Sequence, residues 1–302
     1  MQIVSGPRLF LLLFVALMVI GLQTLCISAP ITYEIKPMIG IVYIQPSSMC
    51  IDNYTRIYGD RVYFYVYYDI SKILNDVKND FRRIHKAGYD FVAIAIPITF
   101  DGMIMKNLKV LVKLARDTGL KILWLALPKR FEDRYLDDPQ IRKQVVEFVR
   151  ELISLDDTLG VAIWYGWTYR FNVSEIVTFF MSIPPDIRKY VWIWLDHPFA
   201  ERLVTKISKH GIAIISRIRF VVECYSIDLA TKISRLPCPK IVITGSNARN
   251  TNEKIAIARA IAIAALNGST LGIAFWIYND VCDGFNQGYA LATPDGVLNP
   301  FH

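Results

Sequence analysis

Residues 91–127 read FVAIAIPITFDGMIMKNLKVLVKLARDTGLKILWLAL, and this stretch indicates the architecture of the whole chain. It opens on the apolar run Phe91–Ile96 and closes on a second run, Lys121–Leu127. Between them, residues 108–118 carry a helical pattern that stops at Gly119, a residue that commonly ends helices. Runs that are apolar throughout, rather than at alternate positions, are typical of parallel strands buried on both faces. The stretch therefore predicts two parallel strands joined by a helix.

The same pattern recurs from about residue 37 to the end of the chain. Eight such runs occur, at residues 38–44, 91–96, 121–127, 161–167, 190–195, 219–225, 240–244 and 272–278. Helical patterns lie at residues 71–87, 108–118, 138–153, 174–182, 199–209 and 252–266, with a short one at 227–235. Eight buried strands separated by helices predict an α/β fold of the (β/α)8, or TIM barrel, type.

An open, doubly wound sheet is the alternative architecture. It is disfavoured because the first strand is followed by Gln45-Pro46-Ser47-Ser48 and not by a glycine-rich phosphate loop. Two irregularities are expected in the barrel. Residues 51–68, rich in Tyr and Val, predict a hairpin-like insertion, and the glycines and prolines after Asp280 predict a reduced or missing eighth helix.

Composition limits the class of protein. The chain has 302 residues, of which 53% are hydrophobic and 20% charged, so it is not disordered and can build a large core. We expect residues 30–302 to form a single barrel domain, because barrels of this type fill about 250 residues as one unit. The net charge of +7 is spread along the chain without a cluster, which argues against nucleic acid as a partner.

Residues 1–29 resemble a targeting segment. Arg8 is their only charged residue, and it precedes the apolar run 9–22 and the small residues Ser28 and Ala29. Cleavage near Ala29 would make this a signal peptide, whereas an apolar stretch extended over residues 9–29 is long enough for a retained membrane anchor. Both readings predict an extracytoplasmic protein, either secreted or anchored to the cell membrane by its N-terminal segment.

Export makes cysteines and glycosylation sequons informative. Beyond Cys26, the chain has Cys50, Cys224, Cys238 and Cys282, which allow three disulfide pairings or remain as buried thiols. Their spacing fits no zinc motif, and we expect neither a metal nor a cofactor. Sequons begin at Asn53, Asn172 and Asn267, so the exported chain would be a glycoprotein in a host that glycosylates. The 40 Ile against 6 Gln follow a tendency of thermophile proteins.

The chemistry of a (β/α)8 barrel lies at the carboxyl ends of its strands. Those ends carry many aromatic residues and scattered carboxylates, a combination that suits a sugar, because rings stack on its apolar faces and carboxylates bind its hydroxyls. The residues expected to bind such a substrate are Trp276, Tyr165, Trp167, Tyr169, His197, Tyr225 and Asn247. Strand-borne Trp and Tyr are otherwise ordinary core residues, and Asn247 otherwise belongs to a solvated loop.

Three segments resemble the superfamily of (β/α)8 glycoside hydrolases that contains the cellulase-like and β-galactosidase-like enzymes. They are residues 80–92 (DFRRIHKAGYDFV), the helix 138–152, and the closing segment 275–296 with FWIYND, GYAL and DG. The resemblance covers most of residues 37–300. It implies a barrel in which a Trp of strand eight, here Trp276, floors a sugar site.

The resemblance also implies two catalytic glutamates that this chain lacks. The family places an acid in an Asn-Glu pair after strand four and a nucleophile at the end of strand seven. Here Thr168-Tyr169 stands at the first position, and strand seven ends Ile243-Thr244-Gly245-Ser246. Neither Tyr nor Ser replaces a pair of carboxyl groups at neutral pH.

The remaining catalytic candidates are Glu223, Asp196 and Asp280. Glu223 stands on an apolar strand, where burial would raise its pKa and allow it to donate a proton, with Asp196 on the neighbouring strand as its partner. Each has a structural alternative: Glu223 pairs with Arg217 or Arg249, Asp196 caps a helix, and Asp280 shapes a loop. The sequence therefore supports two hypotheses, an exported glycoside hydrolase, or an inactive barrel that binds sugar or serves as a cell-surface structural protein. Whether the chain is an enzyme and how it oligomerises stay open.

Overall fold

The computed structural model describes residues 36–46, 69–128, 135–155, 158–166, 172–207, 215–278 and 289–302. Eight parallel strands close into a barrel in sequence order, each paired with the next and β8 paired with β1. They are β1 (Met38–Tyr43), β2 (Phe91–Pro97), β3 (Lys121–Leu127), β4 (Thr158–Trp164), β5 (Val191–Leu195), β6 (Phe220–Glu223), β7 (Lys240–Thr244) and β8 (Thr270–Phe275). The predicted (β/α)8 fold is confirmed.

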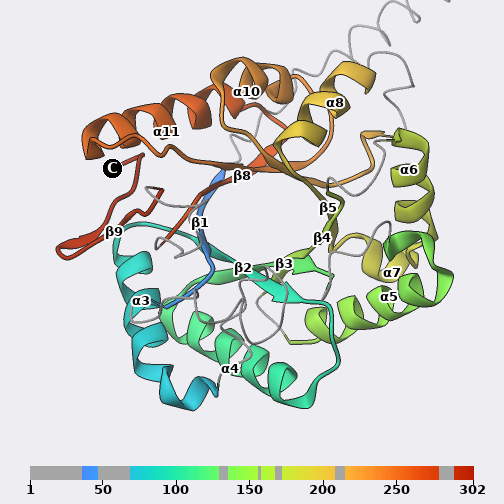
Figure 1. Ribbon diagram of the computed structural model, residues 1–302, viewed down its shortest axis with the longest axis horizontal. Coiled ribbons are helices and arrows are strands. Elements are labelled where there is room, and N and C mark those ends of the chain that lie inside the picture. The colour runs from blue at the N-terminus through green and yellow to red at the C-terminus, as the bar shows by residue number, and fades with distance from the viewer. Residues whose placement is uncertain are drawn as a thin grey trace, which may run out of the picture. The chain divides into compact units, whose positions relative to one another are not determined.

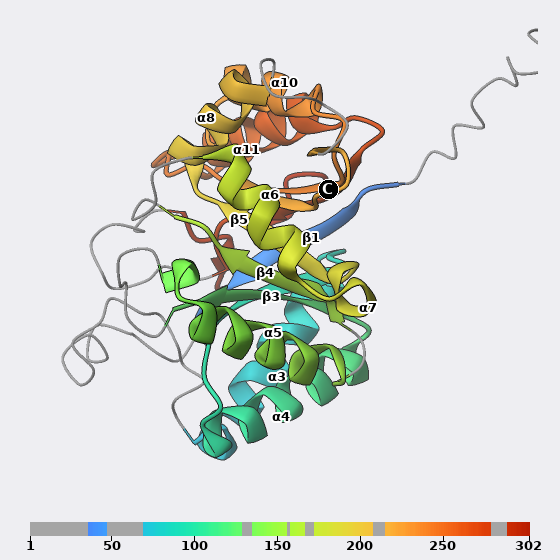
Figure 2. The ribbon, with the colours of Figure 1, turned by 90° about the vertical axis from the view of Figure 1, so that its right-hand side faces the viewer.

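Helices surround the barrel (Figures 1 and 2). They are α3 (Leu74–Lys86), α4 (Gly102–Thr118), α5 (Pro139–Ile153), α6 (Val173–Ser182), α7 (Pro185–Arg188), α8 (His197–Ile207), α10 (Ile227–Ser234) and α11 (Thr251–Ala265), with the 3-10 turns η2 (Ile70–Lys72) and η3 (Tyr135–Asp137). The clearest difference from the sequence pattern is α4, which begins six residues before residue 108. It does so because the Asp101 carboxylate accepts the N–H groups of Met103 and Ile104.

Two glycines identify the residues that face the barrel interior. A Cβ on Gly40 of β1 would lie 2.2 Å from the ring of Phe91, and one on Gly272 of β8 would lie 3.5 Å from the same ring. Phe91 belongs to β2, and β1 lies between β2 and β8 in the sheet. Its ring can be near both Gly40 and Gly272 only if all three residues face the interior of the barrel. Alternate residues of a strand lie on the same face of the sheet, and paired residues of neighbouring strands do so too. The strand register therefore shows which residues of the other strands face the interior.

The barrel closes at a buried carboxylate. Asp80 of α3, only 1% exposed, accepts hydrogen bonds from the hydroxyls of Tyr43 (2.9 Å) and Tyr278 (2.6 Å). Tyr43 ends β1, whereas Tyr278 follows β8 and donates its backbone N–H to the Val42 carbonyl at 2.8 Å. One helix side chain therefore ties together the first strand and the segment after the last one.

The C-terminal residues pack on α3. After β8, the described residues 289–302 contain the short hairpin β9 (Ala292–Thr293) and β10 (Gly296–Val297) and no helix. The Arg83 guanidinium donates to the Thr293 and Gly296 carbonyls, and the Tyr89 hydroxyl donates to the Leu298 carbonyl at 2.6 Å. Figure 1 shows the hairpin strand β9 beside α3.

Several expectations fall on parts of the chain outside the described residues. These are the leader 1–29, the insertion 51–68, and Cys50 and Cys282. Cys224 and Cys238 are buried free thiols, so the framework of two disulfides is not formed. Within the described ranges, no helix is long and apolar enough to cross a membrane.

Candidate functional site

The carboxyl ends of β5 and β6 place a carboxyl group beside an indole. Trp194 pairs with Val221 in the sheet, so Trp192, Trp194 and the next alternate residue, Asp196, face the interior, as does Glu223 at the end of β6. The Trp194 Nε1–H donates to Glu223 Oε1 at 2.9 Å. The Tyr225 hydroxyl donates a longer bond, 3.5 Å, to Oε2. Both oxygens of Glu223 thus accept bonds from aromatic side chains.

Glu223 is an acid at neutral pH. Burial and, after it, the negative charge of Asp196 raise its pKa to about 8, and the bonds from Trp194 and Tyr225 oppose this shift without cancelling it. Arg217 and Arg249, the cations expected as structural partners, are exposed and form no ion pair with Glu223. A proton donor held by two aromatic side chains is therefore present at the mouth of the barrel.

Asp196 stands beside Glu223 on the neighbouring strand. Its charge acts on Glu223, and its Oδ1 accepts the N–H of Phe199 at 3.3 Å in the first turn of α8. The capping role that the sequence left open is therefore present. The same carboxylate supplies negative charge next to the protonated Glu223, so the two roles coexist.

His197 and Tyr225 form one side of this group. The Nδ1 atom of His197 accepts the backbone N–H of Tyr225 at 3.3 Å, and the two rings lie 5.9 Å apart. Because Nδ1 is an acceptor, the proton of the neutral ring is on Nε2, which lies 3.6 Å from the Glu201 carboxylate. Tyr225 also contacts Tyr289, with ring centroids 6.1 Å apart, and burial raises the Tyr225 pKa well above its ordinary value. His197 therefore orients the backbone that carries Tyr225.

Trp276 follows β8 at the same end of the barrel. It is partly exposed, its backbone N–H donates to the Thr244 carbonyl at 2.7 Å, and the Trp276–Ile277 peptide bond is cis. Gly245 faces it from the end of β7: a Cβ there would lie 2.5 Å from the Trp276 carbonyl oxygen and 3.2 Å from the Tyr289 ring. Only glycine allows these three residues to approach so closely. Asn247, two residues further along, is exposed.

Tyr165 does not join this group. It follows Trp164, which faces the interior, so its side chain points to the helix layer. There its ring contacts Phe199 with centroids 6.0 Å apart, and its hydroxyl donates to Glu175 Oε2 of α6 at 3.2 Å. Strand alternation is the reason that a residue expected in the mouth packs between helices. Trp167, Tyr169 and Asp280 lie outside the described residues.

The structure adds two residues that the sequence did not single out for the site, Trp194 and Tyr289. Trp194 precedes Asp196 by two positions, and this spacing on a strand places both on one face. Tyr289 lies in the segment after β8, and no local pattern indicated its contact with Tyr225. The mouth thus combines Asp196, Glu223, Trp194, Tyr225, Tyr289 and Trp276.

Comparison with known proteins identifies the fold. No protein-family model and no curated protein sequence matches the chain. Among solved structures it is similar to the exo-β-1,4-mannosidase Op5Man5 from Opitutaceae bacterium strain TAV5, with a TM-score of 0.64 at 13% identity over 87% of this chain. This chain spans 57% of the length of that protein.

Two further structures give the same result. The virulence factor SghA, in complex with its substrate analog salicin, has a TM-score of 0.53 at 10% identity over 86% of this chain and 92% of its own. The β-glucosidase 1317 has a TM-score of 0.51 at 12% identity over 72% of this chain and 81% of its own. The chain thus shares its (β/α)8 barrel fold with these structures, as the sequence resemblance implied.

Proposed function

We propose that this protein binds carbohydrate at the carboxyl-terminal mouth of its barrel and hydrolyses a glycosidic bond there, with Glu223 as the general acid. The observation that carries the proposal is the Glu223 carboxyl group, which accepts the Trp194 indole N–H and whose pKa is raised by burial and by the charge of Asp196. The mannosidase and glucosidase relatives in fold support a sugar as the ligand. Trp276 and Tyr289 supply aromatic faces for the apolar side of a sugar ring.

The proposed reaction uses the two carboxyl groups in opposite protonation states. Glu223 donates its proton to the leaving glycosidic oxygen as the bond from that oxygen to the anomeric carbon breaks. The oxygen of a water molecule forms the new bond to the anomeric carbon, and Asp196 takes a proton from this water. The proton lost by Glu223 is thus matched by the proton that Asp196 gains. A raised pKa suits an acid, whereas the partner must be ionised to act as a base.

A matched pair of variants tests this reaction. The full-length protein is assayed with aryl β-mannoside, aryl β-glucoside and β-1,4-mannan as substrates. Glu223→Gln is expected to lower the turnover at least 100-fold, because general acid catalysis contributes about 10²–10⁴-fold. Glu147→Gln, the same change at an exposed position of α5, is expected to leave it unchanged. Equal activity of wild type and Glu223→Gln would remove Glu223 from the reaction.

A second candidate function is sugar binding without hydrolysis. This function is favoured because both carboxyl groups already have hydrogen-bond partners within the protein. Both Glu223 oxygens accept hydrogen bonds, and Asp196 caps α8. In this case the wild type shows no turnover, yet sugars change the fluorescence of the wild type and of Glu223→Gln alike. Loss of that response in Trp276→Ala would place the sugar at the mouth.

We also propose that residues 1–29 direct the chain out of the cytoplasm. The apolar run after Arg8 supports this proposal, with either cleavage near Ala29 or retention of residues 9–29 as an anchor. N-terminal sequencing of the protein from cell membranes and from the medium distinguishes the two. Full-length protein recovered from the cytoplasm would contradict export.

A further inference from the structure

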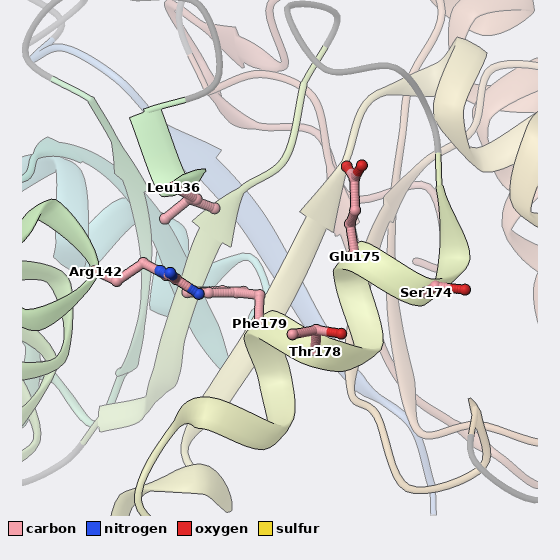
Figure 3. Close-up of a pocket in the computed structure, with 6 residues that line it drawn as sticks. All are labelled: Leu136, Arg142, Ser174, Glu175, Thr178 and Phe179. Atoms are coloured by element: carbon pink, nitrogen blue, oxygen red, sulfur yellow. The ribbon is translucent and has the colours of Figure 1, made fainter. Parts of the chain in front are cut away.

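A pocket on the flank of the barrel is separate from the mouth. It has a volume of about 190 Å³ and is lined by Leu136 of η3, Arg142 of α5, and Ser174, Glu175, Thr178 and Phe179 of α6. In Figure 3 the Arg142 side chain reaches from α5 toward α6, ending beside Phe179, while Glu175 rises from the first turn of α6. None of these residues belongs to the group around Glu223.

Arg142 gives this pocket an unsatisfied donor. Its Nε atom is buried and has no hydrogen-bond partner among the described residues. Buried donors of a folded protein nearly always find an acceptor, and a guanidinium offers several N–H groups in one plane. Arg142 lines the pocket and is partly exposed, but Nε itself is covered. A ligand oxygen in the pocket would therefore satisfy Nε only after a small movement of the Arg142 side chain.

The other lining residues limit the charge of that ligand. Glu175 adds a carboxylate, which accepts the Tyr165 hydroxyl at 3.2 Å and the Asn172 amide at 3.3 Å. This negative charge disfavours an anion beside Arg142, since like charges repel. Ser174 and Thr178 are exposed and add hydroxyls at the rim, while the buried Phe179 and Leu136 add an apolar wall. Donors, acceptors and an apolar wall with no net charge match a neutral polyol.

The volume of the pocket limits the size of the ligand. Pockets for drug-sized ligands measure about 300–1,000 Å³, so this smaller space suits a single sugar ring rather than a chain of sugars. We propose that the pocket between α5 and α6 binds one neutral hexose unit, with Arg142 donating to its oxygens and Glu175 accepting from its hydroxyls. This site does not depend on hydrolysis at the mouth.

Binding of defined probes tests the proposal. The full-length protein is titrated with D-mannose and D-glucose, and with inorganic phosphate as an anionic probe, by isothermal titration calorimetry. Thr178→Trp fills the pocket from an exposed helix position, and Thr205→Trp makes the same change at an exposed position of α8. Arg142→Met removes the donor and keeps an apolar stem. Each variant is checked by circular dichroism for native folding.

A background of Trp276→Ala separates this site from the mouth. In that background we expect a hexose to bind, Arg142→Met to weaken its binding at least tenfold, Thr178→Trp to abolish it, and Thr205→Trp to leave it unchanged. Phosphate binding in place of hexose binding would overturn the proposal, as would hexose binding that neither Arg142→Met nor Thr178→Trp affects. The absence of hexose binding in this background would overturn it too, without affecting the proposal for the mouth.

Discussion

The Trp194 indole donates its N–H to Glu223 across neighbouring strands, at a distance of 2.9 Å. This bond favours the ionised form of Glu223, whereas burial and the charge of Asp196 favour the protonated form and dominate. The contact follows from the β5–β6 register, which pairs Trp194 with Val221, two residues before Glu223 on the same interior face. Trp194 therefore both positions the carboxyl group and limits the rise of its pKa.

Trp194→Phe is expected to raise the pKa of Glu223 above its present value of about 8. The change removes the closer donor to the carboxylate, and a hydrogen bond to a charged group is worth about 1.5–3 kcal/mol, or roughly one to two pH units. Carbon-13 NMR of labelled glutamate side chains measures this titration. A pKa that falls, or stays where it is, would contradict the assigned role of the bond.

Stability is expected to fall with rising pH because of Glu223. Its folded pKa of about 8 lies above the ordinary 4.5, so the folded state binds the proton more tightly. The stabilising contribution is complete below about pH 4.5 and is lost as the pH rises through 8. Glu223→Gln removes this dependence and is expected to be more stable than wild type at pH 9 by about 2 kcal/mol, less than the full shift would give because the side chain is partly exposed.

Urea unfolding of wild type and Glu223→Gln at pH 5, 7 and 9 measures this difference. Glu147→Gln is the matched control, because its exposed carboxyl group should give parallel curves with wild type. If the wild type and Glu223→Gln differ by the same free energy of unfolding at all three pH values, Glu223 does not titrate in this range.

The Asp80 carboxylate is expected to stabilise closure of the barrel. Asp80→Asn turns one of the two acceptors for Tyr43 and Tyr278 into a donor, in a fully buried position. We expect a loss of about 2–3 kcal/mol in the free energy of unfolding. The exposed Asp228, which pairs with Lys232 on the surface of α10, provides the comparison: Asp228→Asn should cost less than about 1 kcal/mol. Equal losses would mean that the Asp80 contacts contribute little.

Gly245 is expected to determine the shape of the mouth. A Cβ at this position would lie 2.5 Å from the Trp276 carbonyl oxygen, so Gly245→Ala must displace the backbone that carries Trp276. We predict a destabilisation of about 1–3 kcal/mol and weaker sugar binding at the mouth. Gly102→Ala in the first turn of α4 has nothing within 4 Å of its Cβ and should be neutral or slightly stabilising. Calorimetry and sugar titration of both variants check this prediction.

The barrel was predictable because its strands are apolar on both faces. A run such as residues 121–127 needs burial on either side, and the helical patterns between the runs supply the cover. Helix ends were less predictable: Asp101 caps α4, which begins six residues before residue 108. The position of Tyr165 was missed because one step along a strand reverses the face of a side chain, and an apolar run does not say which face is interior.

The order and approximate bounds of the eight strands, and the presence of Glu223 and Asp196 at strand ends, were determined by the sequence alone, since apolar runs and their breaks are local features. Only the tertiary structure decided that Trp194 donates to Glu223, that Gly245 lies against Trp276, and that Asp80 joins Tyr43 to Tyr278. These contacts join residues 29 to 198 positions apart or depend on the register between strands. Such distances are set by closure of the barrel, which no local pattern encodes.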